Sequence, residues 1–174
     1  KGKRSIALDL SRPQGRELAV ALIAAAGDDG GNFVTNYPAD GFLSHAALAA
    51  HRADLITVRV TGSSDGRNAV DYTVNCATGY PYLTGPVDAD GPVNHVLPAW
   101  DVSTGLTAAV SLLAADRERR RTGKGCEIRL PLSDVAFAML ANLGHVAEGQ
   151  TSGRDRERHG NALFGTFGRD FATS

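Results

Sequence analysis

The sequence predicts an α/β fold in which helices flank a largely parallel sheet. Along the chain, segments rich in alternating or β-branched apolar residues are followed by segments whose apolar residues recur at helical spacing. Two predicted strands, residues 54–61 and 126–132, stand on either side of the longest helical pattern, residues 101–121. Strands that alternate with helices in this way are typical of a parallel sheet.

The N-terminal part of the chain carries two further strand candidates with a helix between them. Residues 5–10 and 32–37 are apolar or β-branched enough to form strands, and Pro38 ends the second. Ser11 offers an N-cap for a buried helix, which we expect Gly27 to stop. This strand–helix–strand order agrees with the predicted fold class.

The remaining elements are three helices and one long loop. Helical spacing predicts short helices over residues 43–52 and 71–78, and a longer helix capped by Ser133 that runs to about Glu148. Residues 79–99 hold four of the chain's seven prolines, so we expect a loop there. Long loops inside compact domains are usually functional, which makes residues 79–99 a candidate for part of a site.

The composition excludes several classes of function. The chain has 18 Lys and Arg against 19 Asp and Glu, so it lacks the basic surplus of a nucleic-acid-binding protein. No apolar run approaches the ~18 residues of a membrane-spanning helix, so we expect no membrane partner. Cys76 and Cys126 lack the spacing of a zinc site and are too few for a disulfide scaffold. We expect two small buried cysteines in a cytoplasmic protein that needs no metal.

The two ends of the sequence do not resemble natural termini. The chain begins at Lys1 without a Met and stops at Ser174, directly after an aromatic, strand-like stretch. We therefore expect residues 1–174 to be an internal fragment of a longer chain, with an incomplete sheet and an incomplete site.

Three segments of the sequence resemble the family III CoA-transferases. They are KGKRSIALDLSRPQGRE at residues 1–17, Asn36-Tyr37-Pro38, and WDVSTGLTAAVSLLAADRERRRTGKGCEIRLPLSD at residues 100–134, in the family's order and spacing. The resemblance implies part of a family III domain with a Rossmann-like sheet. It also implies a homodimer of two interlocked chains, with CoA bound as part of an acyl-CoA substrate and no other cofactor.

Three other segments, residues 69–86, 91–101 and 158–171, are similar to the branch of this family that acts on mesaconyl-CoA. The similarity implies that CoA moves between the two carboxyls of one bound mesaconate, through mixed anhydrides and an aspartyl-CoA thioester. Transfer of CoA to a second acid, and a non-catalytic CoA- or nucleotide-binding domain, stay open as alternatives. Val70 stands where the racemase branch has a histidine, which argues against racemisation because that reaction needs two acid/base groups.

Asp101 stands where the family has its nucleophilic carboxylate, at the start of the long helix. A carboxylate can attack a thioester and divide the acyl exchange into easier steps. The helix dipole favours its ionised form, which is the nucleophilic one. An aspartate before a helix is most often an N-cap, and Asp101 can combine both roles.

The resemblance also implies two groups of binding residues. Those expected at the acyl group are Asp71, Tyr72, Asn94, His95 and Trp100. Those expected at CoA are Lys3, Arg4, Asn36 and Tyr37. From the residues alone, His95 is equally a solvated loop histidine, Lys3 and Arg4 are an exposed pair, and Tyr37 is a core residue. The arginine-rich segment 117–121 is expected to be a solvated helix end rather than a phosphate site.

Overall fold

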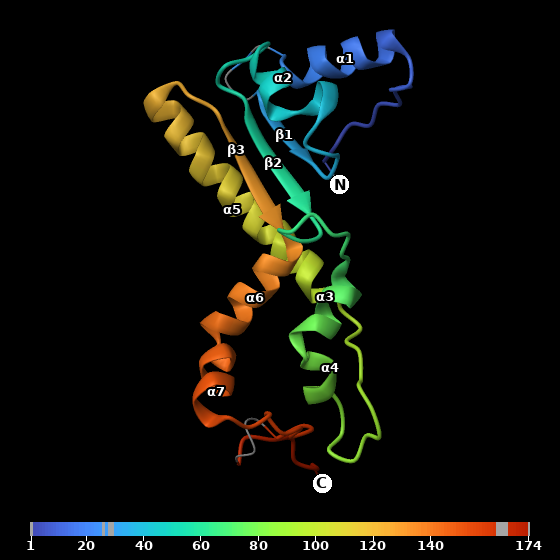
Figure 1. The fold of residues 1–174 in the computed structure, drawn as a ribbon, viewed down its shortest axis with the longest axis vertical. Helices are drawn as coiled ribbons and strands as arrows, with labels where there is room; N and C mark the ends of the chain where they lie inside the picture. The colour runs from blue at the N-terminus through green and yellow to red at the C-terminus, as the bar shows by residue number, and fades with distance from the viewer. Residues whose placement is uncertain (1, 26, 28–29, 163–166, 174) are drawn as a thin grey trace. The chain divides into compact units, whose positions relative to one another are not determined.

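The computed structural model describes residues 2–25, 27, 30–162 and 167–173 (Figure 1). The chain divides into two compact units. The first comprises Lys1–Val60 and Thr107–Leu130, and the second comprises Thr61–Leu106 and Pro131–Ser174. Each unit is therefore built from two separate stretches of sequence.

The first unit contains a three-stranded sheet in the order β1-β2-β3. Its strands are β1 (Asn32–Thr35), β2 (Ile56–Thr61) and β3 (Cys126–Pro131), and all three point the same way (Figure 1). β1 and β2 pair in parallel, with Asn32 opposite Ile56. The predicted α/β fold with a parallel sheet is confirmed. The first four residues of the central strand β2 are buried, as expected for a strand covered on both faces.

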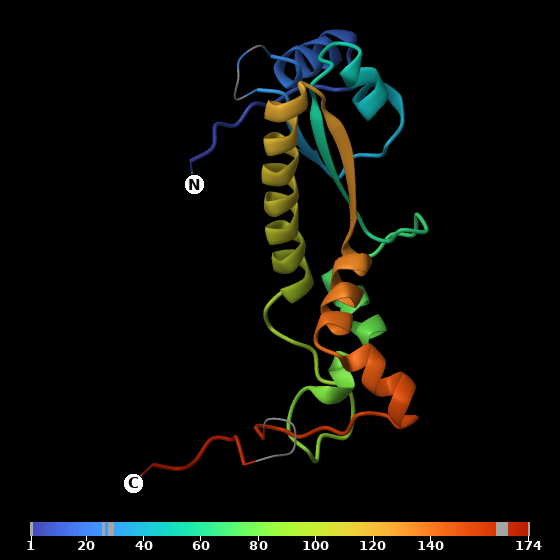
Figure 2. The same cartoon turned by 90° about the vertical axis from the view of Figure 1, so that its left-hand side faces the viewer.

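The long helix α5 (Ala99–Thr122) runs along one face of this sheet (Figure 2). Its Ala108 and Ala115 are two turns apart on the same side of the helix, and they pack against Ile56 and Val58 of β2. Small side chains at this contact let the helix approach the strands closely.

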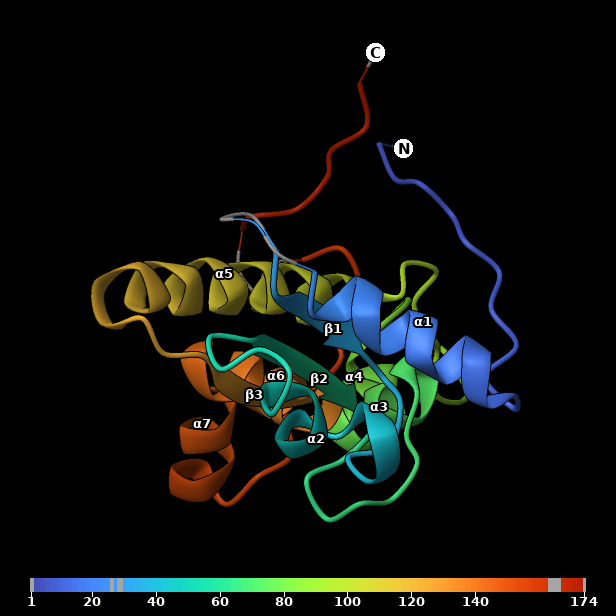
Figure 3. The same cartoon turned by 90° about the horizontal axis from the view of Figure 1, so that it is seen from above.

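Shorter helices cover the other face of the sheet. They are α1 (Pro13–Ile23), the 3-10 helix η1 (Gly41–Leu43) and α2 (His45–Ala49). Seen from above, α2 and α5 lie on either side of the strands (Figure 3). Leu48 of α2 packs against Leu55, and both side chains are fully buried. The central strand β2 is thus covered by helices on both faces, as in other α/β folds.

The second unit is helical and contains the start of α5. Its own helices are α3 (Asp71–Thr78), α4 (Tyr80–Leu83), α6 (Leu132–Asn142) and α7 (His145–Ser152). Its apolar core consists of side chains from α3, α5 and α6, namely Val74, Trp100, Leu132, Ala136 and Leu140. Packing of α3 on α6 therefore fixes the position of the first turn of α5 within this unit.

The side chain of Arg158 ties the segment after α7 to α4 and to the loop that follows α4. Its guanidinium donates hydrogen bonds of 2.8 to 3.1 Å to four backbone carbonyl oxygens, those of Pro81, Tyr82, Ala89 and Gly91. The expected loop over residues 79–99 is thus largely confirmed, with one helical turn, α4, near its start. Residues 163–166 of the mesaconyl-CoA-like segment 158–171 lie outside the described residues.

Residues 5–10 do not form the expected strand. No described strand pairs with them, and a lone extended segment lacks the hydrogen-bond ladder that makes a strand stable. Helix α1 also begins differently, because Arg12 rather than Ser11 occupies the N-cap position. Ser11 instead donates its backbone N–H to the carboxylate of Asp9 over 3.0 Å.

The long helix expected after Ser133 is in fact two helices, α6 and α7. Gly144 lies between them with φ of 80°, a left-handed conformation that ends a helix. The N-cap of α6 is Pro131, not Ser133. The helix expected over residues 43–52 is shorter, because Ser44 accepts a backbone N–H and starts α2 at the next residue.

Cys76 and Cys126 are both exposed, so the expectation that they are buried is wrong. The buried face of α3 is formed by Asp71, Val74 and Asn75, which are three and four residues apart, and Cys76 falls outside it. Within the described residues, no helix is long and apolar enough to cross a membrane. The same part of the chain has no group of three His, Cys, Asp or Glu side chains placed to hold a metal ion.

Candidate functional site

Asp101 is the third residue of α5, and its side chain is exposed. None of the described residues donates a hydrogen bond to its carboxylate. Its backbone N–H is engaged, because it donates to Oδ2 of Asp71 over 3.1 Å. The N-cap interpretation of Asp101 is therefore wrong: the residue lies inside the helix, and another carboxylate accepts the N–H groups of the first turn.

That second carboxylate belongs to Asp71, which begins α3 and is only 2% exposed. Its Oδ2 accepts the backbone N–H groups of Trp100 and Asp101, at 2.7 and 3.1 Å. Its Oδ1 lies 2.9 Å from Nε2 of His95. A carboxylate at this position satisfies N–H groups that have no partner within the helix, and it complements the helix dipole. Asp71 therefore anchors the turn that carries Asp101.

His95 is held in place by its neighbours rather than freely solvated, and its side chain is 21% exposed. Its ring stands edge-on to Tyr72, with the centroids 6.0 Å apart, and lies 6.4 Å from the ring of Trp100. The alternative of a solvated loop histidine is therefore wrong. The structure brings Asp71, Tyr72, His95 and Trp100 together beside the first turn of α5.

Asn75, which sequence reasoning did not identify, completes this cluster and is 2% exposed. Its Oδ1 accepts the indole N–H of Trp100 over 3.1 Å, and its Nδ2 donates to Oδ1 of Asn94 over 2.8 Å. The same Oδ1 of Asn94 accepts the backbone N–H of His95. Asn75 lies four residues after Asp71 and hence on the same face of α3. That spacing is the signal that could have identified it.

Tyr80, whose ring centroid is 5.7 Å from that of Trp100, also lines a cavity of about 650 Å³. Inside it, the Tyr80 hydroxyl is 2.8 Å from Nδ1 of His145, and burial raises the pKa of Tyr80. Arg156 and Glu148 form an ion pair of 2.9 Å at the cavity wall. Tyr80 and His145 are 65 residues apart in sequence, so only the fold brings them together.

The four residues expected at CoA all belong to the first unit. Lys3 and Arg4 are exposed on the extended N-terminal segment. Exposure agrees both with a pair that binds CoA and with an ordinary surface pair. Asn36 and Tyr37 follow β1 directly and are exposed. Because the Tyr37 side chain is 52% exposed, the alternative of a core tyrosine is wrong.

Arg59 holds the main chain that follows these two residues. Its side chain is 1% exposed and donates to the carbonyl oxygens of Tyr37, Pro38 and Leu43. It also contacts the carboxylate of Glu127 over 3.2 Å. The turn after β1 is therefore held in place by hydrogen bonds from a buried arginine to backbone oxygens.

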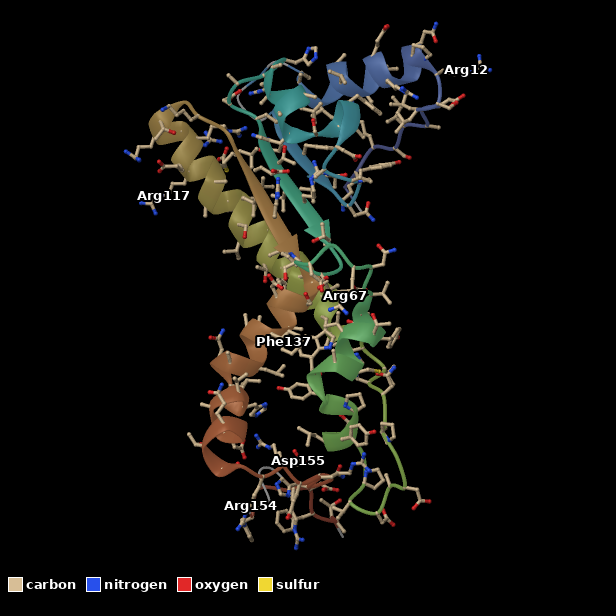
Figure 4. All side chains as sticks on the ribbon, in the orientation of Figure 1. Arg12, Arg67, Arg117, Phe137, Arg154 and Asp155 are labelled. Atoms are coloured by element: carbon tan, nitrogen blue, oxygen red, sulfur yellow. The ribbon has the colours of Figure 1, made fainter. Side chains whose placement is uncertain are left out.

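The arginine-rich segment 117–121 is mostly a solvated helix end, as expected. Arg117 is exposed and projects away from the ribbon (Figure 4). Arg119 is the exception, because it is 5% exposed and donates to the carbonyl oxygens of Gly30 and Gly31 at 3.0 and 3.2 Å. Its role is to hold the turn before β1.

Comparison with known proteins identifies the family. Residues 1–173 match the family described as CoA-transferase family III. The chain belongs to CoA-transferase family III. The 2-methylfumaryl-CoA isomerase of Chloroflexus aurantiacus is 53% identical over 173 residues, which are 99% of this chain and 42% of that protein. The succinate–glutarate CoA-transferase of Agrobacterium fabrum is 32% identical over 171 residues, 93% of this chain and 41% of that protein.

Solved structures agree with this family assignment. A CAIB/BAIF family protein from Brucella suis is 30% identical, with a TM-score of 0.82 over 93% of this chain and 43% of the other. The resemblance seen in the sequence is confirmed. This family III chain spans 42% of the length of its relative from Chloroflexus.

For a family III CoA-transferase, the start of α5 offers the chemistry that acyl exchange requires. The exposed carboxylate of Asp101 is available to attack a thioester carbonyl. The N-terminal end of the helix stabilises negative charge on this carboxylate. The buried carboxylate of Asp71 holds the backbone of this turn in place.

Proposed function

We propose that this chain forms part of an enzyme that moves CoA between the two carboxyls of mesaconate, converting 2-methylfumaryl-CoA into 3-methylfumaryl-CoA. The observation that carries the proposal is the exposed carboxylate of Asp101, which no described residue engages. The 53% identity with the 2-methylfumaryl-CoA isomerase of Chloroflexus aurantiacus supports it.

The first half of the proposed reaction transfers CoA to the enzyme. A carboxylate oxygen of Asp101 attacks the thioester carbonyl, the C–S bond breaks, and CoA leaves as a thiolate from a mixed anhydride. The thiolate then attacks the carbonyl carbon of Asp101 and breaks the C–O bond of the anhydride. The products of this half are an aspartyl-CoA thioester and free mesaconate with two carboxylates.

The second half returns CoA to the other end of the same molecule. The second carboxylate of mesaconate attacks the aspartyl thioester and forms a new mixed anhydride, again with release of the thiolate. The thiolate attacks the mesaconyl carbonyl, which gives the isomeric thioester and regenerates the carboxylate of Asp101. No proton is gained or lost, so the enzyme's tasks are to hold mesaconate in place and to exclude water.

The remaining predicted residues take the following places in this proposal. Residues at the acyl group are Asp71, Tyr72, Asn94, His95 and Trp100, and those at CoA are Lys3, Arg4, Asn36 and Tyr37. The chain acts as part of a longer polypeptide, since it spans 42% of its relative's length. That polypeptide is a cytoplasmic homodimer with CoA as part of its substrate and no further cofactor.

Mass spectrometry of the full-length enzyme incubated with 2-methylfumaryl-CoA tests the proposal. We expect a CoA adduct on Asp101 and the accumulation of the 3-methyl isomer. Borohydride and hydroxylamine should both trap the adduct, because each reacts with an aspartyl thioester. Turnover without any adduct at Asp101 would refute the mechanism.

Transfer of CoA to a second acid is the alternative with a specific observation in its favour. The succinate–glutarate CoA-transferase of Agrobacterium fabrum is 32% identical over 93% of this chain. Addition of isotopically labelled free mesaconate separates the two reactions. An intramolecular reaction leaves the product unlabelled, whereas an intermolecular one incorporates the label. A non-catalytic CoA-binding protein gives neither adduct nor product.

A further inference from the structure

One face of α3 carries two buried polar side chains that both form hydrogen bonds with the first turn of α5. We propose that these two, Asp71 and Asn75, are positioning residues that together set where the carboxylate of Asp101 lies. They act on Asp101 through its backbone and through its neighbour Trp100, without touching the substrate. The inference rests on the proposed function, because it concerns the attack that Asp101 makes there.

Asp71 acts directly on the backbone of Asp101. Its Oδ2 accepts the N–H groups of Trp100 and Asp101 over 2.7 and 3.1 Å, so a single atom fixes two successive peptide units. Its Oδ1 lies 2.9 Å from Nε2 of His95. Both oxygens therefore contact groups of the protein, and the residue is 2% exposed. Asp71 lies among the residues expected at the acyl group, but this burial leaves its carboxylate out of reach of a ligand.

Asn75 acts on the side chain that precedes Asp101. Its Oδ1 accepts the indole N–H of Trp100 over 3.1 Å, and an indole nitrogen can only donate, so this bond fixes the direction of the amide. Its Nδ2 then donates to Oδ1 of Asn94 over 2.8 Å. Asn75 is as deeply buried as Asp71. It therefore joins the ring of Trp100 to the loop that precedes α5.

Asp71 and Asn75 are also held rigidly relative to each other. They lie four residues apart on one helix, so their side chains leave α3 on the same face. Val74, next to Asn75, packs with Trp100 in the apolar core of this unit. Three donors on residues 100 and 101 thus meet two acceptors on one packed helix. Three such bonds fix both the place and the orientation of the turn.

The proposed attack depends on this placement. None of the described residues donates a hydrogen bond to the carboxylate of Asp101, so the protein sets its place through the backbone of the turn. A reacting group must lie close to the atom that it attacks, and a displacement of about 1 Å can slow a reaction by roughly 100-fold. The bonds from Asp71 and Asn75 therefore bear on the rate of attack as well as on stability.

The test separates position from folding in the full-length enzyme. Saturating 2-methylfumaryl-CoA is added, and rapid quenching with mass spectrometry follows the first appearance of the CoA adduct on Asp101. The amplitude of this phase reports the fraction of enzyme that is folded. The rate constant reports how well Asp101 is placed. A role in folding alone lowers the amplitude and leaves the rate constant unchanged.

Asp71→Glu is the first variant. It keeps the charge and the acceptor oxygens but moves them by one methylene group relative to α5. We expect the rate constant to fall by about 10- to 100-fold. Asp71→Asn keeps an acceptor in the original place and should recover most of the rate. Asp134→Glu is the matched control, because Asp134 also lies in the first turn of a helix, α6, and is exposed.

Asn75→Ala is the second variant, and it tests the inference even if Asp71→Glu does not fold. It releases the indole of Trp100 but leaves the backbone bonds of Asp101 in place. We expect the rate constant to fall by about 5- to 10-fold, the equivalent of one neutral hydrogen bond. Cys76→Ala, on the adjacent exposed position of α3, should leave the rate constant unchanged.

Lower rate constants in Asp71→Glu and Asn75→Ala, with both controls at the wild-type value, would support the inference. Wild-type rate constants in the two variants would overturn it, even if their amplitudes fall. The proposed function would then stand, because the adduct still forms on Asp101. Turnover of the wild type without any adduct on Asp101 would instead refute the proposed function, and the inference with it.

Discussion

The first turns of α3 and α5 each contain an aspartate, and the protein treats the two carboxylates in opposite ways. Asp71 is 2% exposed and meets donors at both of its oxygens. Asp101 is exposed and receives no hydrogen bond from the described residues. Both lie at helix N-termini, so the helix dipole does not distinguish them. The two carboxylates differ because the protein supplies donors to Asp71, whereas none of the described residues donates a hydrogen bond to the carboxylate of Asp101.

The largest expected effect is on catalysis by Asp101→Asn. If Asp101 is the covalent nucleophile, as proposed, its substitution should lower the rate of the proposed CoA transfer by about 10⁴-fold or more. Stability should change by less than about 0.5 kcal/mol, because an exposed carboxylate without partners holds nothing together. Turnover assays and urea unfolding of the same preparation measure both quantities. A variant that is fully active, or one that is strongly destabilised, would contradict the contrast with Asp71.

Asp71→Ala, unlike Asp101→Asn, should have a large effect on the stability of the fold. The substitution leaves the N–H groups of Trp100 and Asp101 without an acceptor in a buried place. We expect the free energy of unfolding to fall by about 2 to 4 kcal/mol. Urea unfolding of the full-length protein measures the loss, and Asp71→Asn should recover most of it because its amide oxygen still accepts. No difference in stability between these two variants would show that Asp71 is not the cap.

Asn75→Ala tests the hydrogen-bond network beside Asp71. The substitution removes the partner of the buried Trp100 indole N–H and of Asn94. We expect a loss of about 1 to 3 kcal/mol, the usual result when a buried donor is left unsatisfied. Cys76→Ala is the matched control on the adjacent, exposed position of α3 and should have almost no effect. Equal melting temperatures for the two variants would contradict this account.

A third carboxylate, Glu127, tests how hydrogen-bond donors change the pKa of a carboxyl group and, through it, the stability of the fold. We expect this effect to be the smallest of those predicted here. Burial raises its pKa, but hydrogen bonds from Arg59 and Arg129 outweigh burial and hold the pKa below its ordinary value of 4.5. A carboxyl group whose pKa is lowered by folding stabilises the fold above its unfolded-state pKa, and this stabilisation is lost as the pH falls through the folded-state pKa.

Glu127→Gln should therefore make the free energy of unfolding depend less steeply on pH under acidic conditions. Below pH 4.5, the wild type should lose unfolding free energy more steeply than the variant. Urea unfolding at a series of acidic pH values measures the two slopes. Parallel curves would show that the ion pairs with Glu127 do not contribute to stability.

Much of the fold could be predicted because its elements carry strong local signals. The helical pattern over residues 101–121 corresponds to α5, and residues 126–132 correspond to β3 with one residue fewer. Residues 71–78 match α3 in both bounds. The strand expected over residues 5–10 was wrong, because strand formation depends on a neighbour that local sequence does not reveal.

Which residues belong to the candidate site could be predicted better than how those residues are arranged. Resemblance to the family selected Asp71, His95 and Trp100, which the structure does bring together. The hydrogen bonds between them span 24 and 29 residues, and no local pattern encodes contacts at that separation. Asp71, rather than Asp101, caps the helix that contains Asp101, and only the three-dimensional structure could reveal this.

Arg59 and Arg158 hold two segments of the chain through hydrogen bonds to main-chain oxygens. The course of these segments therefore does not depend on which side chains they carry. Every amino acid has a carbonyl oxygen, so replacing Tyr37 or Ala89 leaves each arginine with its partners. Side chains on these loops can therefore be exchanged for others of different charge or size while the loops keep their course. Such loops are natural starting points for redesigning which molecules the protein accepts.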